Sequence, residues 1–122
     1  MNLSKVKIKT TLKSKEENHT FDGYGIKNKN IITYIDNNVI TKITIDNIIT
    51  IERKQQYSLK INLKESINLE GKYITKYGTF KVETYTKKIV KTKNTLKLTY
   101  DLNINGEYID TFTYNLEYSI DS

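Results

Sequence analysis

Apolar and polar residues alternate over long stretches at both ends of the chain. Near the N terminus, every second position is occupied by Val6, Ile8, Thr10, Leu12 and Ser14, with lysines at most positions between them. Near the C terminus, one face carries Tyr108, Phe112, Tyr114, Leu116, Tyr118 and Ile120, with a single acidic interruption at Asp110. Because successive side chains of a strand point to opposite faces, this period of two predicts strands with one dry and one wet face. The pattern constrains the fold strongly, although it contains no catalytic chemistry.

Asparagine-rich turns occur at short intervals and divide the chain into about ten strands. Asp46-Asn47 is a candidate two-residue hairpin, and Asn105-Gly106 is the strongest hairpin dipeptide in the sequence. This spacing is typical of an antiparallel meander, in which each strand pairs with the next. The predicted strands are residues 5–15, 19–27, 31–35, 39–45, 48–54, 57–63, 66–73, 80–89, 95–104 and 107–120.

A closed barrel suits these strands best. An open sheet of ten strands would leave two unpaired edges and would curl, whereas a closed meander removes both edges. A β-sandwich is the main alternative, but its Greek-key crossings need longer connections than those seen here. Ala is absent, and residues 63–69 are the only candidate for a helical turn. We therefore predict an all-β protein, a closed antiparallel meander β-barrel of about 8–10 strands, with residues 1–122 as one domain.

Glycines mark positions where the backbone departs from a regular strand. Gly23 and Gly25 lie inside a predicted strand, where glycine usually indicates a bulge or a sharp bend. Gly71 and Gly78 flank a polar segment, and we expect both to supply positive φ angles for a turn. An anion-binding nest formed by these two glycines is the alternative.

The composition excludes several classes of site. The chain has no Cys, so a disulfide, a zinc ribbon and a thiol nucleophile are impossible, and a cytoplasmic protein is expected. His19 is the only histidine, and nothing near it in the sequence completes a metal site or a catalytic triad. The first 15 residues are rich in lysine and lack an apolar run, so neither a secretory signal nor a membrane helix is predicted. We expect no metal, no cofactor and no catalytic residue, and we do not predict an enzyme.

Short motifs distributed along the chain resemble those of the YwiB-like family. They are Gly-Lys-Tyr-Ile-Thr-Lys-Tyr-Gly at 71–78, Thr-Tyr-Thr at 84–86, Leu-Thr-Tyr at 98–100 and Asn-Gly-Glu at 105–107. Upstream, Tyr-Gly at 24–25 and Ile-Glu-Arg at 51–53 fit the same pattern, so the resemblance covers nearly the whole chain. It implies a small bacterial protein with a lipocalin-like (calycin) barrel. Because the family has no established activity, the resemblance transfers no catalytic residue.

Arg53 is the only arginine among the 20 basic residues. It shares a strand face with Ile49 and Ile51, so the guanidinium lies just inside one mouth if those residues face the barrel interior. A guanidinium there offers a rigid fork of donors that could hold a ligand carboxylate or phosphate. The alternative is an ion pair at the barrel end with Glu52, Glu70 or another acid.

Four tyrosines form the second group of candidate binding residues. Tyr100, Tyr114 and Tyr118 lie on faces with apolar residues and are predicted to point inward, and Tyr73 is expected to join them. A phenol combines an apolar body with one polar tip, which suits the wall of a cavity for a ligand with one polar head. The alternative is ordinary core packing, with each hydroxyl bonded to the backbone or to water. An arginine with tyrosines inside a barrel resembles the way that fatty-acid-binding barrels hold carboxylates, at the level of the fold alone.

Three functions remain open from the sequence. We favour a barrel that binds a small amphipathic or apolar ligand in its interior through Arg53 and the inward tyrosines. The second is a nucleic-acid-binding module, which rests on the net charge of +6 and on the lysines at positions 5, 7, 9, 13 and 15. The third is a structural or protein-interaction domain without a ligand.

Overall fold

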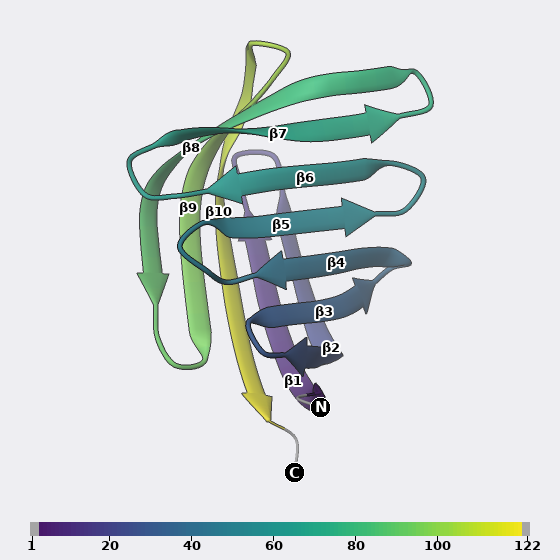
Figure 1. The fold of residues 1–122 in the computed structure, drawn as a ribbon, viewed down its shortest axis with the longest axis vertical. Coiled ribbons are helices and arrows are strands. Elements are labelled where there is room, and N and C mark those ends of the chain that lie inside the picture. The colour runs from purple at the N-terminus through teal and green to yellow at the C-terminus, as the bar shows by residue number, and fades with distance from the viewer. Residues whose placement is uncertain (1–2, 121–122) are drawn as a thin grey trace.

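The computed structural model describes residues 3–120, whose strands form one closed antiparallel barrel (Figure 1). Each strand pairs with its neighbours in the sequence, and the first strand pairs with the last to close the barrel. The predicted all-β meander barrel is therefore confirmed. In chain order the strands are β1 (Leu3–Lys13), β2 (Asn18–Asn28), β3 (Ile31–Asp36), β4 (Val39–Thr44), β5 (Ile49–Lys54), β6 (Ser58–Leu63), β7 (Asn68–Thr75), β8 (Gly78–Lys91), β9 (Thr95–Ile104) and β10 (Glu107–Ile120).

The barrel consists of two halves that cross each other. In Figure 1, β3 to β7 lie side by side in one direction, while β1, β2, β9 and β10 run across them. β8 is 14 residues long and belongs to both halves, because it pairs with β7 and with β9. Pairing is short at two places: β2 pairs with β3 over four residues, at the corner where the halves meet, and β6 pairs with β7 over three within one half. The interior is thus the space between two crossed sheets, which side chains can fill.

A glycine lies at each of these two places because two backbones approach closely there. A Cβ at Gly25 would lie 2.5 Å from the carbonyl oxygen of Thr33, and a Cβ at Gly71 would lie less than 3.0 Å from the carbonyl oxygen of Lys60. The bend expected around Gly25 therefore coincides with a corner. The expectation of a positive φ holds for Gly78, at 137°, but is wrong for Gly71, which is needed for close approach rather than for a turn.

Apolar side chains fill most of the barrel interior. On β1, Val6, Ile8 and Leu12 are buried and the lysines between them are exposed, as the alternation predicts. The other buried apolar residues are Ile32, Tyr34, Ile43, Ile49, Ile51, Ile61, Leu63, Val82, Leu96, Leu98, Tyr100, Leu102, Tyr114 and Leu116. Each aliphatic side chain of this kind stabilises the fold by roughly 1.5–3 kcal/mol on burial. The interior is therefore a packed core along most of its length.

Most turns follow the sequence, but the two-residue hairpin predicted at Asp46-Asn47 is wrong, because residues 45–48 together connect β4 to β5. Asn105 and Gly106 both have positive φ, as a tight hairpin turn requires, and so do Asn37 and Asn38. The candidate helical turn at 63–69 is instead a tight turn between β6 and β7, in which the Ile67 amide donates to the Lys64 carbonyl at 3.2 Å. Within residues 3–120, no helix is long and apolar enough to cross a membrane.

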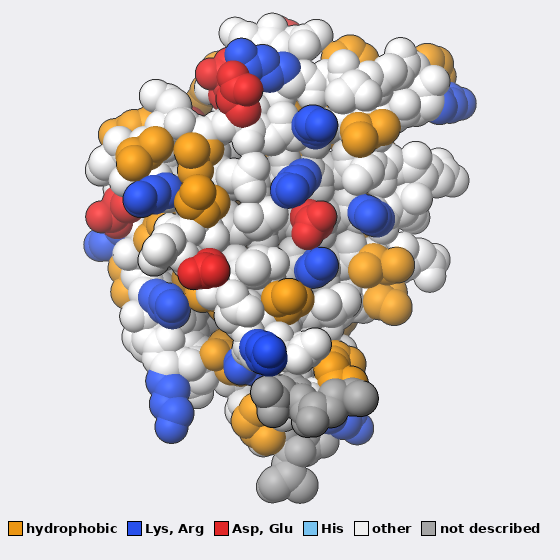
Figure 2. All heavy atoms as spheres, viewed as in Figure 1, with side chains coloured by type: hydrophobic (Ala, Val, Ile, Leu, Met, Phe, Trp, Pro, Cys, Tyr) orange, Lys and Arg blue, Asp and Glu red, His pale blue; other side chains and the backbone are white. Residues whose placement is uncertain are grey.

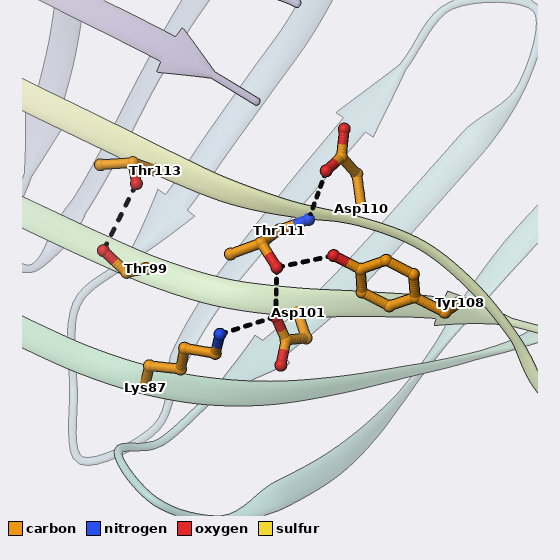
Figure 3. A network of polar contacts seen from close by, with 7 residues as sticks. All are labelled: Lys87, Thr99, Asp101, Tyr108, Asp110, Thr111 and Thr113. Carbon is orange, nitrogen blue, oxygen red and sulfur yellow. Dashed lines mark hydrogen bonds and ion pairs between the residues drawn. The ribbon is translucent and has the colours of Figure 1, made fainter. Parts of the chain in front are cut away.

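A β-bulge in β10 changes which side chains face inward. The register with β9 shifts between Tyr108 and Asp110, so the alternation does not continue through this point. Tyr108 is consequently 58% exposed on the outer surface, and the prediction that it shares the inner face is wrong. Its hydroxyl lies 2.8 Å from the hydroxyl of Thr111 (Figure 3).

An outer polar network joins β8, β9 and β10 near this bulge (Figure 3). The Asp101 carboxylate accepts a hydrogen bond from the Thr111 hydroxyl and lies 3.5 Å from the Lys87 ammonium nitrogen. The Thr111 amide donates to the Asp110 carboxylate at 2.7 Å. Asp101 and Lys87 therefore already have each other as partners, and the network connects strands rather than presenting an unpaired group to a ligand.

Candidate ligand pocket at one mouth of the barrel

A small pocket lies at the mouth where the β1–β2, β3–β4 and β5–β6 turns meet. Its volume is about 210 Å³. Strand residues form its inner wall, and the turns form its rim. The lining residues are Thr10, Leu12, Glu17, His19, Tyr34, Asp36, Asn37, Val39, Thr41, Arg53, Tyr57 and Tyr114.

Arg53 enters this pocket from the end of β5. Ile49 and Ile51, on the same face of the strand, are buried in the core, so the parity of β5 directs Arg53 to the interior side. The acids considered as its ion-pair partners lie elsewhere: Glu52 is 3.9 Å from Lys42, and Glu70 is 2.9 Å from Lys81. Among residues 3–120, no side chain or carbonyl forms a hydrogen bond or an ion pair with the Arg53 guanidinium.

Two phenol hydroxyls meet on the inner wall of the pocket. The Tyr34 and Tyr114 oxygens lie 2.7 Å apart, and the two side chains are 4% and 1% exposed. One hydroxyl donates to the other, so the second proton of the pair is not used in this contact. No other hydrogen bond involves these two oxygens within residues 3–120. The pair can therefore offer one more donor to an acceptor in the pocket.

The charges of the pocket affect the pKa values of two buried tyrosines, Tyr100 and Tyr114. Burial raises the pKa of Tyr100 to about 12; the positive charge of Arg53 opposes this effect and the negative charge of Glu17 reinforces it. Burial also raises the pKa of Tyr114 well above its usual value of 10.0, helped by the Tyr34 hydroxyl and opposed by Arg53. Both phenols are thus neutral donors at physiological pH, within reach of the charge of Arg53.

The structure brings together two of the five predicted site residues and separates the others. Arg53 and Tyr114 line the pocket, and Tyr100 is buried against Phe112, with ring centroids 5.7 Å apart. Tyr73 does not line this pocket, but its ring packs edge-on against that of Tyr57, which does, with centroids 5.8 Å apart.

Tyr118 is placed at the other end of the barrel. Its hydroxyl donates to the Lys93 carbonyl at 2.8 Å, in the turn between β8 and β9. It packs against the core from that end and lines separate hollows near Thr95. Four residues along β10 span roughly 13 Å, so Tyr118 and Tyr114 serve opposite ends of the interior.

Side-chain contacts close the gap between β2 and β3 at the rim. These strands do not pair beyond Gly25, but the His19 Nε2 and Asp36 Oδ2 atoms lie 2.6 Å apart, and the Phe21 ring stacks on Tyr34 with centroids 4.8 Å apart. Sequence reasoning missed His19 and Asp36 because they are 17 residues apart. Their positions could have indicated the contact. In a meander, the start of one strand and the end of the next lie at the same end of the sheet.

Other hollows and ligating groups are less suited to a small polar ligand. A larger open trough of about 730 Å³ lies on the outer surface, where Tyr24, Ile26 and Ile35 are exposed. Its lining includes Lys5 and Lys42 but is predominantly apolar. In the part of the chain that the structure describes, no group of three His, Cys, Asp or Glu residues could hold a metal ion.

The fold and the pocket together define a lipocalin-like β-barrel with a small polar pocket at one mouth. The chain belongs to the family described as a domain of unknown function (DUF1934), whose family model matches residues 4–116. It is also similar to the crystal structure of the YwiB protein from Bacillus subtilis, with a TM-score of 0.64 and 13% sequence identity, over 98% of this chain and 94% of that chain. No curated protein matches the chain. The resemblance noted in the sequence is thereby confirmed, and it concerns the fold.

Proposed function

We propose that this protein binds a small amphipathic molecule with an acidic head group in the mouth pocket, where Arg53 holds that group. The observation that carries the proposal is the Arg53 guanidinium, which lines the pocket without a hydrogen bond or ion pair from residues 3–120. A partly buried guanidinium without a partner gains more from a carboxylate or phosphate than a fully solvated one does. The hydroxyl pair of Tyr34 and Tyr114 supplies a further donor on the same wall.

The size of the pocket limits the ligand. Sites for drug-sized ligands usually enclose about 300–1,000 Å³, whereas this pocket has about 210 Å³. The interior below it is filled by buried side chains such as Leu12 and Ile51. We therefore favour a short-chain acid over a long-chain fatty acid or another large apolar molecule.

A thermal-shift and NMR screen tests this proposal. The probes are acetate, butyrate, hexanoate and inorganic phosphate, each measured on the wild-type protein and on Arg53→Gln. A ligand at 100 times its dissociation constant stabilises the folded state by about 2.7 kcal/mol, so a raised melting temperature is expected for the wild type only. Lys54→Gln is the matched control, because it removes one positive charge from the next, exposed position of β5. No stabilising probe, or equal stabilisation of Arg53→Gln, would refute the role of Arg53.

The two other functions have less support. A nucleic-acid-binding role relies on the lysines of β1, but Lys9 lies beside Asp22 on β2 and Glu117 on β10. On the face drawn in Figure 2, basic side chains stand apart from one another with acidic and neutral ones between them. RNA binding that weakens steeply with salt would favour this role, and the absence of any ligand would favour a structural or interaction domain. A cytoplasmic location, expected from the lack of cysteine, stays a prediction.

A further inference from the structure

The mouth pocket carries two opposite charges that do not neutralise each other. Arg53 reaches the pocket from β5, and Glu17 reaches it from the turn between β1 and β2. Within residues 3–120, neither side chain forms an ion pair or a hydrogen bond, with the other or with any third group. The other acid at the rim, Asp36, is already engaged by His19 at 2.6 Å.

The turn that carries Glu17 is held in place by several hydrogen bonds. The Ser14 hydroxyl oxygen accepts from the amides of Glu16 and Glu17 at 3.2 and 3.0 Å, and the Ser14 amide donates to the Glu17 carbonyl at 2.9 Å. From β10, Asp110 lies near this turn, because Ser14, Lys15 and Glu16 contribute to the lowering of its pKa after the larger effect of the Thr111 amide. The position of Glu17 at the rim is therefore set by the hydrogen bonds within the turn.

We infer that the ligand of this pocket is a small zwitterion, an amino-carboxylate whose carboxylate binds Arg53 and whose ammonium binds Glu17. This inference rests on the proposed role of Arg53. A simple anion would meet Arg53 but would also approach the negative charges of Glu17 and Asp36. A simple cation would be attracted by Glu17 but repelled by Arg53. A molecule with both charges satisfies both side chains, and about 210 Å³ accommodates a molecule of amino-acid size.

Matched probes test separately the contact of the carboxylate with Arg53 and the contact of the ammonium group with Glu17. Butyrate, butylamine and 4-aminobutyrate have four carbons each and differ only in which charges they carry. Their dissociation constants are measured by NMR titration of amide shifts, and the ω-amino acids from glycine to 6-aminohexanoate follow, to find the best spacing of the two charges. We expect 4-aminobutyrate, or the best member of that series, to bind at least about tenfold tighter than butyrate or butylamine of matched length, since one added charged contact is worth about tenfold or more.

Two variants and one control distinguish this inference from the proposed function. Glu17→Gln is expected to weaken the amino-carboxylate about tenfold while leaving butyrate unchanged or slightly tighter. Arg53→Gln is expected to weaken both, and Glu16→Gln, on the same turn, is expected to change neither. If Glu17→Gln does not alter the preference for the amino-carboxylate over butyrate while Arg53→Gln abolishes butyrate binding, the zwitterion inference fails and the proposed function stands. If no probe in the panel binds the wild type, both fail.

Discussion

The hydroxyl pair of Tyr34 and Tyr114 allows a sharp test of how the inner wall of the pocket is built. The two oxygens lie 2.7 Å apart, contributed by strands from opposite halves of the barrel. Replacing either tyrosine by phenylalanine keeps the ring and removes one oxygen. The remaining hydroxyl is then left in an interior where the side chains are only 4% and 1% exposed. Leaving a buried polar group without a partner costs about 1–3 kcal/mol.

Removing both oxygens together has a different consequence. The Tyr34→Phe/Tyr114→Phe double variant leaves no unpaired hydroxyl, and replacing both partners of a buried hydrogen bond by apolar groups is close to neutral. We therefore expect each single variant to lose about 2 kcal/mol of unfolding free energy and the double variant to lose about 1 kcal/mol or less. The loss in the double variant is thus smaller, by at least about 3 kcal/mol, than the sum of the losses in the two single variants.

Urea unfolding, followed by circular dichroism, measures these free energies. The slope of unfolding free energy against urea is compared among the variants, so that a change in midpoint reports stability alone. Tyr24→Phe serves as control, because Tyr24 is exposed on the outer surface and is expected to change stability by less than about 0.5 kcal/mol. Strictly additive losses would refute the reasoning, because each hydroxyl would then have a separate partner such as a pocket water.

Three further predictions concern Gly71, the buried phenol of Tyr100 and the carboxylate of Asp110. Gly71→Ala places a Cβ against the Lys60 carbonyl oxygen, and we expect urea unfolding to show a loss of about 2–3 kcal/mol. The pKa of Tyr100, raised to about 12, contributes stability that is fully present below pH 10 and is lost as the pH rises through 12. Two pKa units correspond to about 3 kcal/mol, and Tyr100→Phe should flatten the decline in urea-unfolding free energy measured from pH 9 to 12. The pKa of Asp110 is lowered, chiefly by the Thr111 amide, so the stability that this contact contributes is present above the usual value of 3.8 and lost as the pH falls through the lowered one. Asp110→Asn should speed hydrogen exchange of the Thr111 amide at neutral pH, because an amide oxygen accepts this bond less strongly than a carboxylate does.

The strands could be predicted because their signals are local. Alternation along β1 directs Val6 and Ile8 inward whatever the rest of the chain does, and Asn105-Gly106 forms its turn with its own backbone. The inward direction of Arg53 follows from the same parity, once Ile49 and Ile51 are known to be buried. The direction of Arg53 could therefore be predicted from the sequence, because it depends only on the alternation within its own strand.

The rest of the site depends on contacts between segments that are distant in the chain. Tyr34 and Tyr114 are 80 residues apart, and they meet because the two halves of the barrel cross and close. The pairing of His19 with Asp36 requires β2 and β3 to diverge after Gly25, a corner geometry that alternation does not encode. The bulge after Tyr108 likewise turns this side chain to the outer face, although the alternation in the sequence continues without a break.

The packing of this barrel determines what kind of specificity its pocket can have. Because the interior is filled by isoleucine and leucine along most of its length, little apolar wall is left for a ligand. The remaining hollow lies at a mouth, where strands end and polar turn residues such as Glu17 and Asn37 replace the core. Affinity at such a place comes from charge and hydrogen bonding rather than from buried apolar area. Arg53 and Glu17 should therefore determine which molecules bind, and lengthening the hydrocarbon chain of a ligand should weaken binding once the chain reaches the core.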